Sequence, residues 1–297
     1  MCIRDRKYTE VPETKYEDYV TNDEYWFQQK MDGTRVLVTW KPGCPVQFFQ
    51  RDGKPLSYAA AVLHKDGLDP AVQVLYSVAA AVYNQPEATM RRRLTFDGEL
   101  VIHEGNEAVL YVWDVLDVSK PETIYSSRFQ MLSRIMEEFG LLWPENTRIV
   151  QSKTVRWTDE KRAFLEQAKE AGVEGVMAKW IREEFRPGER TNTTVKLKFV
   201  KEADVVVTGF ERGRNDAGRE VGSAEFAVYD SEGHRIKVGR CSLIGKPEVE
   251  VGSVITVKYL YWTGSAVVQP RMVWLRHDKA PEECTVDQFA AYSKEAL

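Results

Sequence analysis

Hydrophobic residues follow two different periods along the chain, and the change from one to the other divides the sequence. Apolar runs rich in β-branched and aromatic residues, which are typical of strands, occur at 36–40, 46–50, 94–103, 108–118, 175–180 and 195–200. Segments with apolar residues at helical spacing lie between them and predict helices near 70–83, 127–139 and 158–171. The pattern up to residue 201 therefore predicts an α+β domain of antiparallel sheets and helices.

The ends of these helices carry local signals. Asp69 suits an N-cap, and Pro70 suits the first position of the helix that follows. Gly140 and Gly172 stand just after the other two helical segments, where a left-handed backbone is easiest for glycine.

Beyond residue 201 the helical spacing stops, and short strand-like segments follow one another with turn residues between them. This spacing is typical of a small closed β-barrel, and five strands suit an OB-fold. The sequence therefore predicts two domains, an α+β domain over 1–201 and an OB-fold over 202–297.

Composition narrows the class of protein. The chain has 297 residues and a net charge of −4, which gives no overall attraction to nucleic acid. It lacks the run of about 18 apolar residues that a membrane helix needs, and its charged start, MCIRDR, is unlike a secretory signal. We expect MCIRDR to stand outside the fold. The four cysteines are scattered without a Cys-x-x-Cys pair, which favours a reducing cytoplasm over a disulfide or zinc framework.

The segment KMDGTR contains the most suggestive chemistry. A lysine amine such as that of Lys30 attacks phosphorus only when it is deprotonated, which burial or neighbouring cations favour. Gly33 permits a tight turn, and Arg35 can clamp a ligand rich in oxygen atoms. An ordinary junction between a strand and a turn would explain the same six residues, so the motif alone leaves both interpretations open.

Further polar groups follow at the ends of other predicted strands. Glu99 can accept hydrogen bonds from ribose hydroxyls or bind a metal, and Trp113 can stack on a purine. Lys196 and Lys198 alternate along a strand and so share one face. The five-residue offset from Glu174 to Lys179 puts this pair on opposite faces of an ideal strand, so a shared site would need a bend.

In order along the chain, the segments KMDGTR, FDGEL, YVWDV, EGVMAK, VKLK and RHDK resemble motifs I, III, IIIa, IV, V and VI of the covalent nucleotidyltransferases. The resemblance is strongest to small ATP-dependent DNA ligases, which join an adenylation domain to an OB-fold. It implies that Lys30 attacks the α-phosphorus of ATP, releases pyrophosphate and becomes lysyl-AMP, from which AMP is then passed to the 5′-phosphate of nicked duplex DNA.

The resemblance also implies roles for the other motif residues. It implies that the catalytic residues are Lys30, Lys196 and Lys198. It also implies that Glu99 and Glu174 bind a divalent metal, which is Mg²⁺ with Mn²⁺ as a substitute. Nucleotide contacts, including orientation of pyrophosphate by the last three residues, fall to Gln28, Gln29, Lys30, Arg35, Arg51, Glu99, Trp113, Lys179, Lys196, Lys198, Arg276, Asp278 and Lys279. Three positions depart from common family patterns. Thr194 replaces a frequent tryptophan, Trp113 replaces a phenylalanine or tyrosine, and glutamine precedes Lys30 where glutamate is common.

The basic segments suggest where DNA would bind, although a charge run taken alone is more often a solvated surface. We expect a monomer that binds DNA through Arg91, Arg92, Arg93, Arg182, Arg186, Arg212, Arg214 and Arg219. Two other functions stay open. One is an RNA ligase or an mRNA-capping guanylyltransferase with the same lysine chemistry, and the other is a non-catalytic OB-fold nucleic-acid binder.

Overall fold

The computed structural model describes residues 7–56, 67–84, 94–103, 107–117, 119–144, 147–186, 189–214, 220–289 and 297. The described chain forms two compact units. The first comprises the described residues up to 168 together with 175–197 and 297, and the second comprises 169–174 and 198–289. Each unit is described by itself below. The leader MCIRDR lies outside the described residues.

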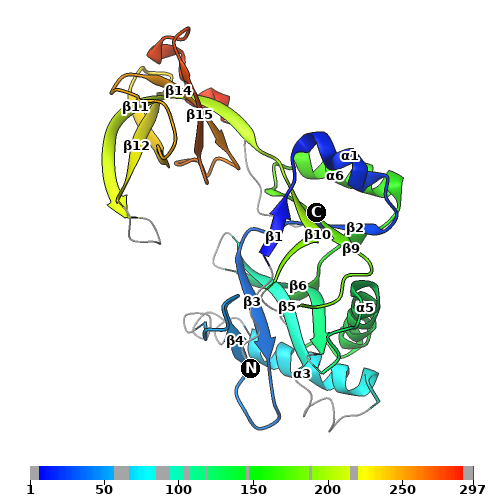
Figure 1. Ribbon diagram of the computed structural model, residues 1–297. Helices are drawn as coiled ribbons and strands as arrows, with labels where there is room; N and C mark the ends of the chain where they lie inside the picture. Colours follow the sequence, from blue (N-terminus) through cyan, green and yellow to red (C-terminus); the bar gives the residue numbers. More distant parts are fainter. Residues whose placement is uncertain are drawn as a thin grey trace. The chain divides into compact units, whose positions relative to one another are not determined.

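The first sheet of the first unit has the order β1-β10-β9-β2-β8. Strands β2 and β9 are antiparallel, while β1 and β10 are parallel, and in the other sheet of this unit β6 and β7 are parallel too. Both sheets are therefore mixed, and the expectation of antiparallel sheets is wrong for these edge strands. Two helices lie together beside it in Figure 1, and Lys161 of one of them is fully buried, donating hydrogen bonds to the Asn22 and Tyr25 carbonyls at 2.8 and 3.2 Å. The elements are β1 (Lys7–Glu10), α1 (Tyr16–Val20), β2 (Tyr25–Gln29), β8 (Thr154–Val155), α6 (Thr158–Glu170), β9 (Gly175–Trp180) and β10 (Arg190–Lys198), with the short η1 (Glu13–Lys15).

The second sheet of the first unit has the order β4-β3-β5-β6-β7, and helices α3 and α5 cover it (Figure 1). Its long central strands are almost wholly buried, which explains why the sequence reads there as continuous apolar runs. Tyr76 of α3 donates a hydrogen bond to the Val38 carbonyl at 2.6 Å and so fixes helix against sheet. The elements are β3 (Thr34–Thr39), β4 (Gln47–Phe49), α3 (Leu68–Val82), β5 (Leu94–Ile102), β6 (Ala108–Asp117), α5 (Tyr125–Leu141) and β7 (Ile149–Gln151).

The second unit is built around one antiparallel sheet with the order β13-β12-β11-β14-β15. Its core includes Val205, Phe226, Ile255 and Tyr259, all at most 1% exposed. Five strands agree with the expectation, but among the described residues no strand pairing joins β13 to β15, so the predicted closed barrel is not confirmed. The elements are β11 (Lys201–Arg214), β12 (Glu220–Tyr229), β13 (Arg235–Ser242), β14 (Val254–Tyr259), β15 (Arg271–Arg276), η3 (Pro281–Glu283) and η4 (Val286–Gln288).

Two predicted helix ends are wrong and one is right. Helix α3 begins one residue before Asp69, after Gly67 in a left-handed conformation at φ 72°, so Asp69 lies in the first turn instead of capping it. Helix α5 continues through Gly140 to Leu141. Gly172 does adopt the left-handed conformation just after α6, at φ 71°.

None of the helices in the described part of the chain is long and apolar enough to cross a membrane.

Candidate active site

Lys30 lies at the point where the chain leaves one sheet of the first unit and enters the other. Strand β2 ends at Gln29, and β3 begins at Thr34. The backbone N–H of Lys30 donates a hydrogen bond to the Gly175 carbonyl at 2.9 Å, which holds the connection against the start of β9. The side chain is partly buried. The lysine is therefore held at the junction of two sheets instead of projecting from a mobile turn.

Two motif glycines are required by close approaches of backbone to backbone. A Cβ atom on Gly33 would lie 2.3 Å from the Leu100 carbonyl oxygen, and one on Gly98 would lie 2.5 Å from the Tyr111 carbonyl oxygen. Both distances are far below any normal contact. The glycine of KMDGTR thus lets the lysine loop rest on β5, and the glycine of FDGEL lets β5 rest on β6.

The carboxyl group of Glu99 interacts electrostatically with the ammonium group of Lys30. Glu99 is opposite Arg35 in the β3–β5 register, and it accepts a hydrogen bond from the Gly33 N–H at 3.2 Å. Burial raises the pKa of Glu99 to about 7, although the Lys30 ammonium, the Arg35 guanidinium and the Gly33 N–H all oppose that rise. The Glu99 carboxyl therefore changes charge close to neutral pH while it faces two cations.

Arg35 is held in one orientation from three sides. It forms a two-pronged ion pair with Asp97, at 2.9 Å from Nε and 2.6 Å from Nη2. The rings of Tyr8 and Trp113 have their centroids 5.5 and 5.7 Å from the guanidinium carbon. Such a pair, buried between two aromatic rings, pre-organises the arginine at small entropic cost. The predicted nucleotide-contacting residues Arg35 and Trp113 are therefore brought together.

Lys179 is buried behind this pair. Its ammonium lies 4.9 Å from the centroid of the Tyr125 ring and 5.6 Å from that of Trp113. Burial lowers the pKa of Lys179 to about 8, against the attraction of Asp114, Asp97 and Glu183. Lys179, Tyr125 and these three carboxylates line a narrow cavity together with Tyr8, Phe185 and Thr194. Lys179 contacts the aromatic residue predicted to stack on a base, which places it beside the predicted site.

A second buried ion pair ties the two sheets of the first unit together. Arg128 of α5 binds Asp114 of β6 through two hydrogen bonds of 2.9 and 2.8 Å. Its Nη1 also donates to the backbone carbonyls of Thr123 and Glu183, at 2.5 and 3.1 Å. Because Glu183 follows β9 and Asp114 belongs to β6, this single guanidinium joins the motif IIIa strand to the segment after the motif IV strand.

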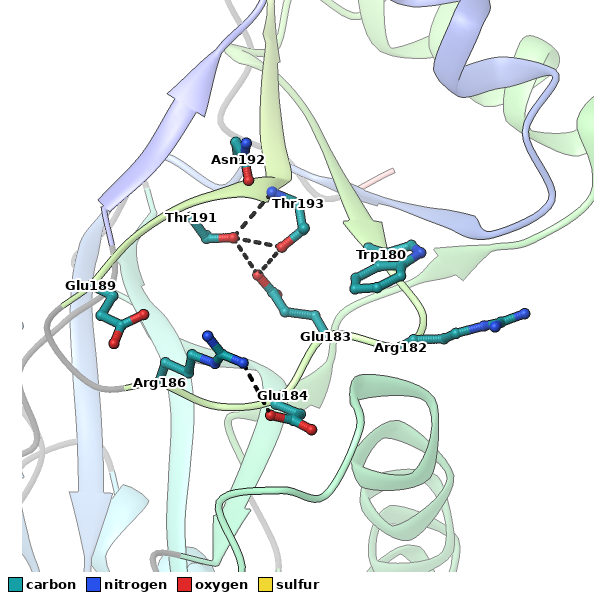
Figure 2. Close-up of a pocket in the computed structure, with 9 residues that line it drawn as sticks. All are labelled: Trp180, Arg182, Glu183, Glu184, Arg186, Glu189, Thr191, Asn192 and Thr193. Carbon is teal, nitrogen blue, oxygen red and sulfur yellow. Dashed lines mark hydrogen bonds and ion pairs between the residues drawn. The ribbon is translucent and has the colours of Figure 1, made fainter.

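Figure 2 shows that Glu183 is also the centre of a cluster of threonines. Its Oε1 accepts hydrogen bonds from the hydroxyls of Thr191 and Thr193, both at 2.7 Å. Its Oε2 accepts one from the buried Thr194 at 2.6 Å. At Thr194, where relatives often have tryptophan, this chain therefore places a hydroxyl that binds Glu183 and that a tryptophan would remove.

The Glu183 cluster forms one wall of a pocket of about 380 Å³ that also holds two arginines predicted to bind DNA (Figure 2). Arg182 pairs with Glu24 at 2.6 Å, and Arg186 pairs with Glu184 at 3.5 Å. Both side chains are about two-thirds exposed. Arg212 is exposed on β11, and only the backbone of Arg214 is described there. Arg91, Arg92, Arg93 and Arg219 lie outside the described residues.

The predicted residues on either side of the lysine loop have defined positions. Gln28 is buried, and its amide donates a hydrogen bond to the Thr154 hydroxyl at 2.7 Å. The Gln29 side-chain oxygen accepts a hydrogen bond from the Leu297 N–H at 2.8 Å. Arg51 is exposed in the turn that follows β4. Of the two glutamines before Lys30, Gln28 is therefore the one that is buried and held by a hydrogen bond to β8.

Lys196 and Lys198 both lie on β10, in alternate positions as expected. Within the second unit, the Lys198 ammonium lies 3.5 Å from Glu174, which is buried, and 3.3 Å from the Gln269 side-chain oxygen. Glu174 thus pairs with a motif V lysine, whereas Lys179 contacts Trp113 and Tyr125. Glu174 lies just before the first residue of β9, so the strand alternation expected of Glu174 and Lys179 stays a prediction.

The RHDK segment of the second unit forms a compact ion-pair network. Arg276 binds Asp278 through two hydrogen bonds of 2.7 and 2.8 Å. Arg276 and Lys279 both contact Asp204, at 3.1 and 2.8 Å. The described residues contain no group of three or more His, Cys, Asp or Glu side chains arranged as a ready-made metal site.

Four residues that position the site were missed by sequence reasoning: Tyr8, Arg128, Glu183 and Asp204. Each acts through a tertiary contact between different elements of the fold, so no local sequence pattern marks it. The pairing of Asp97 with Arg35 did carry a signal, because Asp97 stands two residues before Glu99 on a strand and must share its face.

Comparisons with known proteins agree with this geometry. A family model described as the ATP-dependent DNA ligase domain matches residues 11–198. The chain belongs to the ATP-dependent DNA ligase domain family. A DNA ligase of Thermococcus onnurineus is 30% identical over 216 residues, which cover 61% of this chain and 38% of the relative. A DNA ligase of Archaeoglobus fulgidus is 34% identical over 221 residues, which cover 71% of this chain and 39% of the relative. The ligase-family chain therefore spans well under half the length of these curated relatives.

Solved structures show that the fold, too, is that of the ligase family. A structure of a Lig E DNA ligase aligns with a TM-score of 0.57 at 17% identity, over 92% of this chain and all of that one. The ligase of bacteriophage T7 in complex with ATP aligns with a TM-score of 0.51 at 13% identity, over 92% and 99% of the two chains. The mixed sheets and few helices of this chain therefore match the architecture of these ligases.

Proposed function

We propose that the protein is an ATP-dependent DNA ligase that seals nicks in duplex DNA as a monomer. The single observation that carries the proposal is the placement of Lys30, held at the junction of two sheets beside the buried, cation-facing Glu99. The first unit serves as the adenylation domain and the second as an OB-type domain. Family membership supports the choice of ligase over a capping enzyme or a non-catalytic binder.

In the first step, the Lys30 nitrogen forms a bond to the α-phosphorus of ATP while the bond from that phosphorus to the bridging oxygen breaks. Pyrophosphate leaves, and the amine gives up its proton. Arg35 and Glu99 hold the ribose, Trp113 stacks on adenine, and Lys196 and Lys198 neutralise the phosphate oxygens. Such positioning and charge neutralisation supply most of the catalysis in phosphoryl and nucleotidyl transfer.

In the later steps, AMP passes from Lys30 to the 5′-phosphate at the nick, and the 3′-hydroxyl then attacks that phosphate and expels AMP. The covalent intermediate divides one difficult condensation into easier transfers. Arg276, Asp278 and Lys279 act on the pyrophosphate group of the first step.

The residues present fit a divalent metal that is bound together with ATP. Mg²⁺ usually takes one or two carboxylates plus substrate phosphates and water, so a preformed cluster of three carboxylates is not required. In the first unit, Glu99 is the carboxylate proposed to bind the metal. In the second unit, Glu174 is the carboxylate proposed to do so. Bound Mg²⁺, or Mn²⁺ in its place, would supply neutralisation of charge on the phosphate oxygens.

One measurement tests the chemistry. The protein is incubated with a divalent metal and either ATP or GTP, and its intact mass is measured after acid quenching. We expect addition of AMP from ATP and none from GTP, because the proposal is a ligase and not a capping enzyme. Lys30→Ala should abolish the adduct, whereas Lys41→Ala, an exposed lysine in the turn after β3, should not. A GMP adduct, or an unchanged adduct in Lys30→Ala, contradicts the proposal.

The DNA substrate is tested separately. Binding to a nicked duplex through exposed arginines such as Arg182 and Arg212 depends on phosphate contacts, and its affinity therefore falls steeply as salt rises. A titration over about 50–200 mM salt should show a linear decrease of log affinity with log salt. Replacing either arginine by glutamine should make that slope shallower by about one unit. A slope of zero for the unaltered protein contradicts DNA binding by these surfaces.

A further inference from the structure

Asp204 receives contacts from both cations of the RHDK segment. Its Oδ2 lies 2.8 Å from the Lys279 ammonium and 3.1 Å from Nη1 of Arg276. Its Oδ1 accepts a hydrogen bond from the hydroxyl of Thr256, its cross-strand neighbour on β14. Asp204 belongs to β11, more than seventy positions before the segment that it organises, and it has no place in the six motifs.

The backbone of Asp204 is fixed as well as its carboxylate. Gln288 of η4 donates a hydrogen bond from Nε2 to the Asp204 carbonyl at 2.9 Å and accepts one from its N–H at 2.8 Å. The side chain is only 13% exposed. Burial would raise the pKa of Asp204, but hydrogen bonds from Lys279 and Thr256 and the charges of Lys279 and Arg276 lower it. The carboxylate is therefore ionised at neutral pH. It is held in place by Thr256 of β14, by Arg276 of β15 and by Lys279, which follows β15.

The geometry shows what this carboxylate does to the two cations. Two like charges would move apart if each were free to turn toward solvent. A shared carboxylate oxygen keeps them on the same side of the sheet, and the second arm of Arg276 is oriented by Asp278. The result is a pair of neighbouring positive groups of fixed spacing, which suits a ligand with several adjacent phosphate oxygens.

We infer that Asp204 is a positioning residue for pyrophosphate, holding Arg276 and Lys279 side by side so that they engage it together during lysine adenylation and its reversal. This inference rests on the proposed function. Asp204 itself does not touch substrate. Its removal should leave both cations present but unaligned, which weakens their joint action on pyrophosphate and leaves the later transfer to DNA intact.

The test compares Asp204→Asn with Glu202→Gln. Glu202 is the matched control because it lies two residues earlier on the same face of β11 and pairs with Lys258 at 3.2 Å, away from RHDK. Three quantities are measured in the full chain: the rate of lysyl-AMP formation from ATP, the pyrophosphate concentration that half-saturates its reversal, and single-turnover sealing of a nick that already carries the adenylate. Thermal unfolding of each variant monitors the fold.

We expect Asp204→Asn to slow lysyl-AMP formation about tenfold and to raise the half-saturating pyrophosphate concentration by a similar factor. Sealing of the adenylated nick should stay within about twofold, and Glu202→Gln should match the unaltered protein throughout. Thr256→Val, which keeps the carboxylate but removes one of its hydrogen bonds, should give a smaller change of the same sign. It also serves if Asp204→Asn fails to fold.

Other outcomes overturn the inference in distinguishable ways. Equal losses in all three quantities show a general structural role for Asp204. Unchanged adenylation in Asp204→Asn shows that the cations need no alignment by this carboxylate. If the unaltered protein forms no lysyl-AMP at all, the proposed function fails and the inference fails with it. In a protein that already carries Arg276→Ala and Lys279→Ala, the change Asp204→Asn should have no further effect on lysyl-AMP formation. A further loss in that background contradicts the shared mechanism.

Discussion

Two ion pairs, one in each unit, use charge in opposite ways. In the first unit, Arg128, Asp114 and Lys179 are buried, and their charges are compensated by one another, by neighbouring carboxylates, by backbone carbonyls and by aromatic rings. In the second, Glu202 and Lys258 pair on an exposed face of the sheet, each with nearly half its side chain in water. Water compensates the loss of an exposed partner but cannot compensate the loss of a buried one. The Arg128–Asp114 pair therefore stabilises the fold of the first unit, whereas the exposed Glu202–Lys258 pair contributes little to that of the second.

The strongest test of this contrast is the buried pair of Arg128 and Asp114. Arg128→Met removes a guanidinium that binds Asp114 and two carbonyls, leaving a buried carboxylate without its cation. We expect a loss of about 3–5 kcal/mol in the free energy of unfolding, measured by urea denaturation. The control Arg162→Met, at an exposed helix position paired with Glu17, should cost less than about 1 kcal/mol. Equal losses in the two variants would falsify the contrast.

The second test uses pH at Glu99. Its pKa in the folded protein, about 7, is above the ordinary value of 4.5. The folded state therefore binds the proton more tightly, and stability is lost as pH rises from about 4.5 to about 7. Glu99→Gln removes this loss. We expect the variant to be more stable than the unaltered protein by roughly 3 kcal/mol at pH 8 and similar to it at pH 4.5.

The same variant should lose lysyl-AMP formation, because a neutral amide cannot replace the carboxylate that faces Lys30. Glu170→Gln, at an exposed position of α6, is the control and should change neither quantity. A stabilised but inactive Glu99→Gln would show that this charge is kept for chemistry at the expense of the fold. A variant that is destabilised at pH 8 contradicts the burial-driven rise of the Glu99 pKa.

The smallest effect is expected for the exposed pair of the second unit. Glu202→Gln breaks the ion pair with Lys258, and we expect a change of less than about 0.5 kcal/mol in the free energy of unfolding. Raising the salt concentration should reduce even that difference, since exposed pairs are screened. A loss as large as that of Arg128→Met would contradict the expected difference between the buried Arg128–Asp114 pair and the exposed Glu202–Lys258 pair.

The sequence predicted the parts of the fold that depend on local pattern. The apolar runs at 94–103 and 108–118 are the buried strands β5 and β6, and the alternation of Lys196 and Lys198 is that of β10. The start of α3 was misplaced because the left-handed Gly67 precedes the residues with the usual capping signals. Gly140 does not end α5, in whose last turn the ring of Phe139 packs at a tilt against that of Trp143, with centroids 5.7 Å apart.

The site was predictable where motif spacing reports on a shared strand face, and not where partners come from afar. Asp97 and Glu99 share a face because they are two residues apart. Asp204 and Lys279 are 75 residues apart, and the pairing of β11 with β14 and of β14 with β15 brings them together. A single sequence contains no period or motif for such a contact.

The crowding at Gly33 has a genetic consequence. With the Leu100 oxygen only 2.3 Å from where any side chain would begin, every one of the nineteen alternatives collides with backbone, which cannot rotate aside. In a saturation library selected for ligation, position 33 should retain a single amino acid, while neighbouring Met31 and Thr34 accept several. Every single substitution at this codon should therefore inactivate the protein, so selection for ligation should keep position 33 as glycine while its neighbours vary.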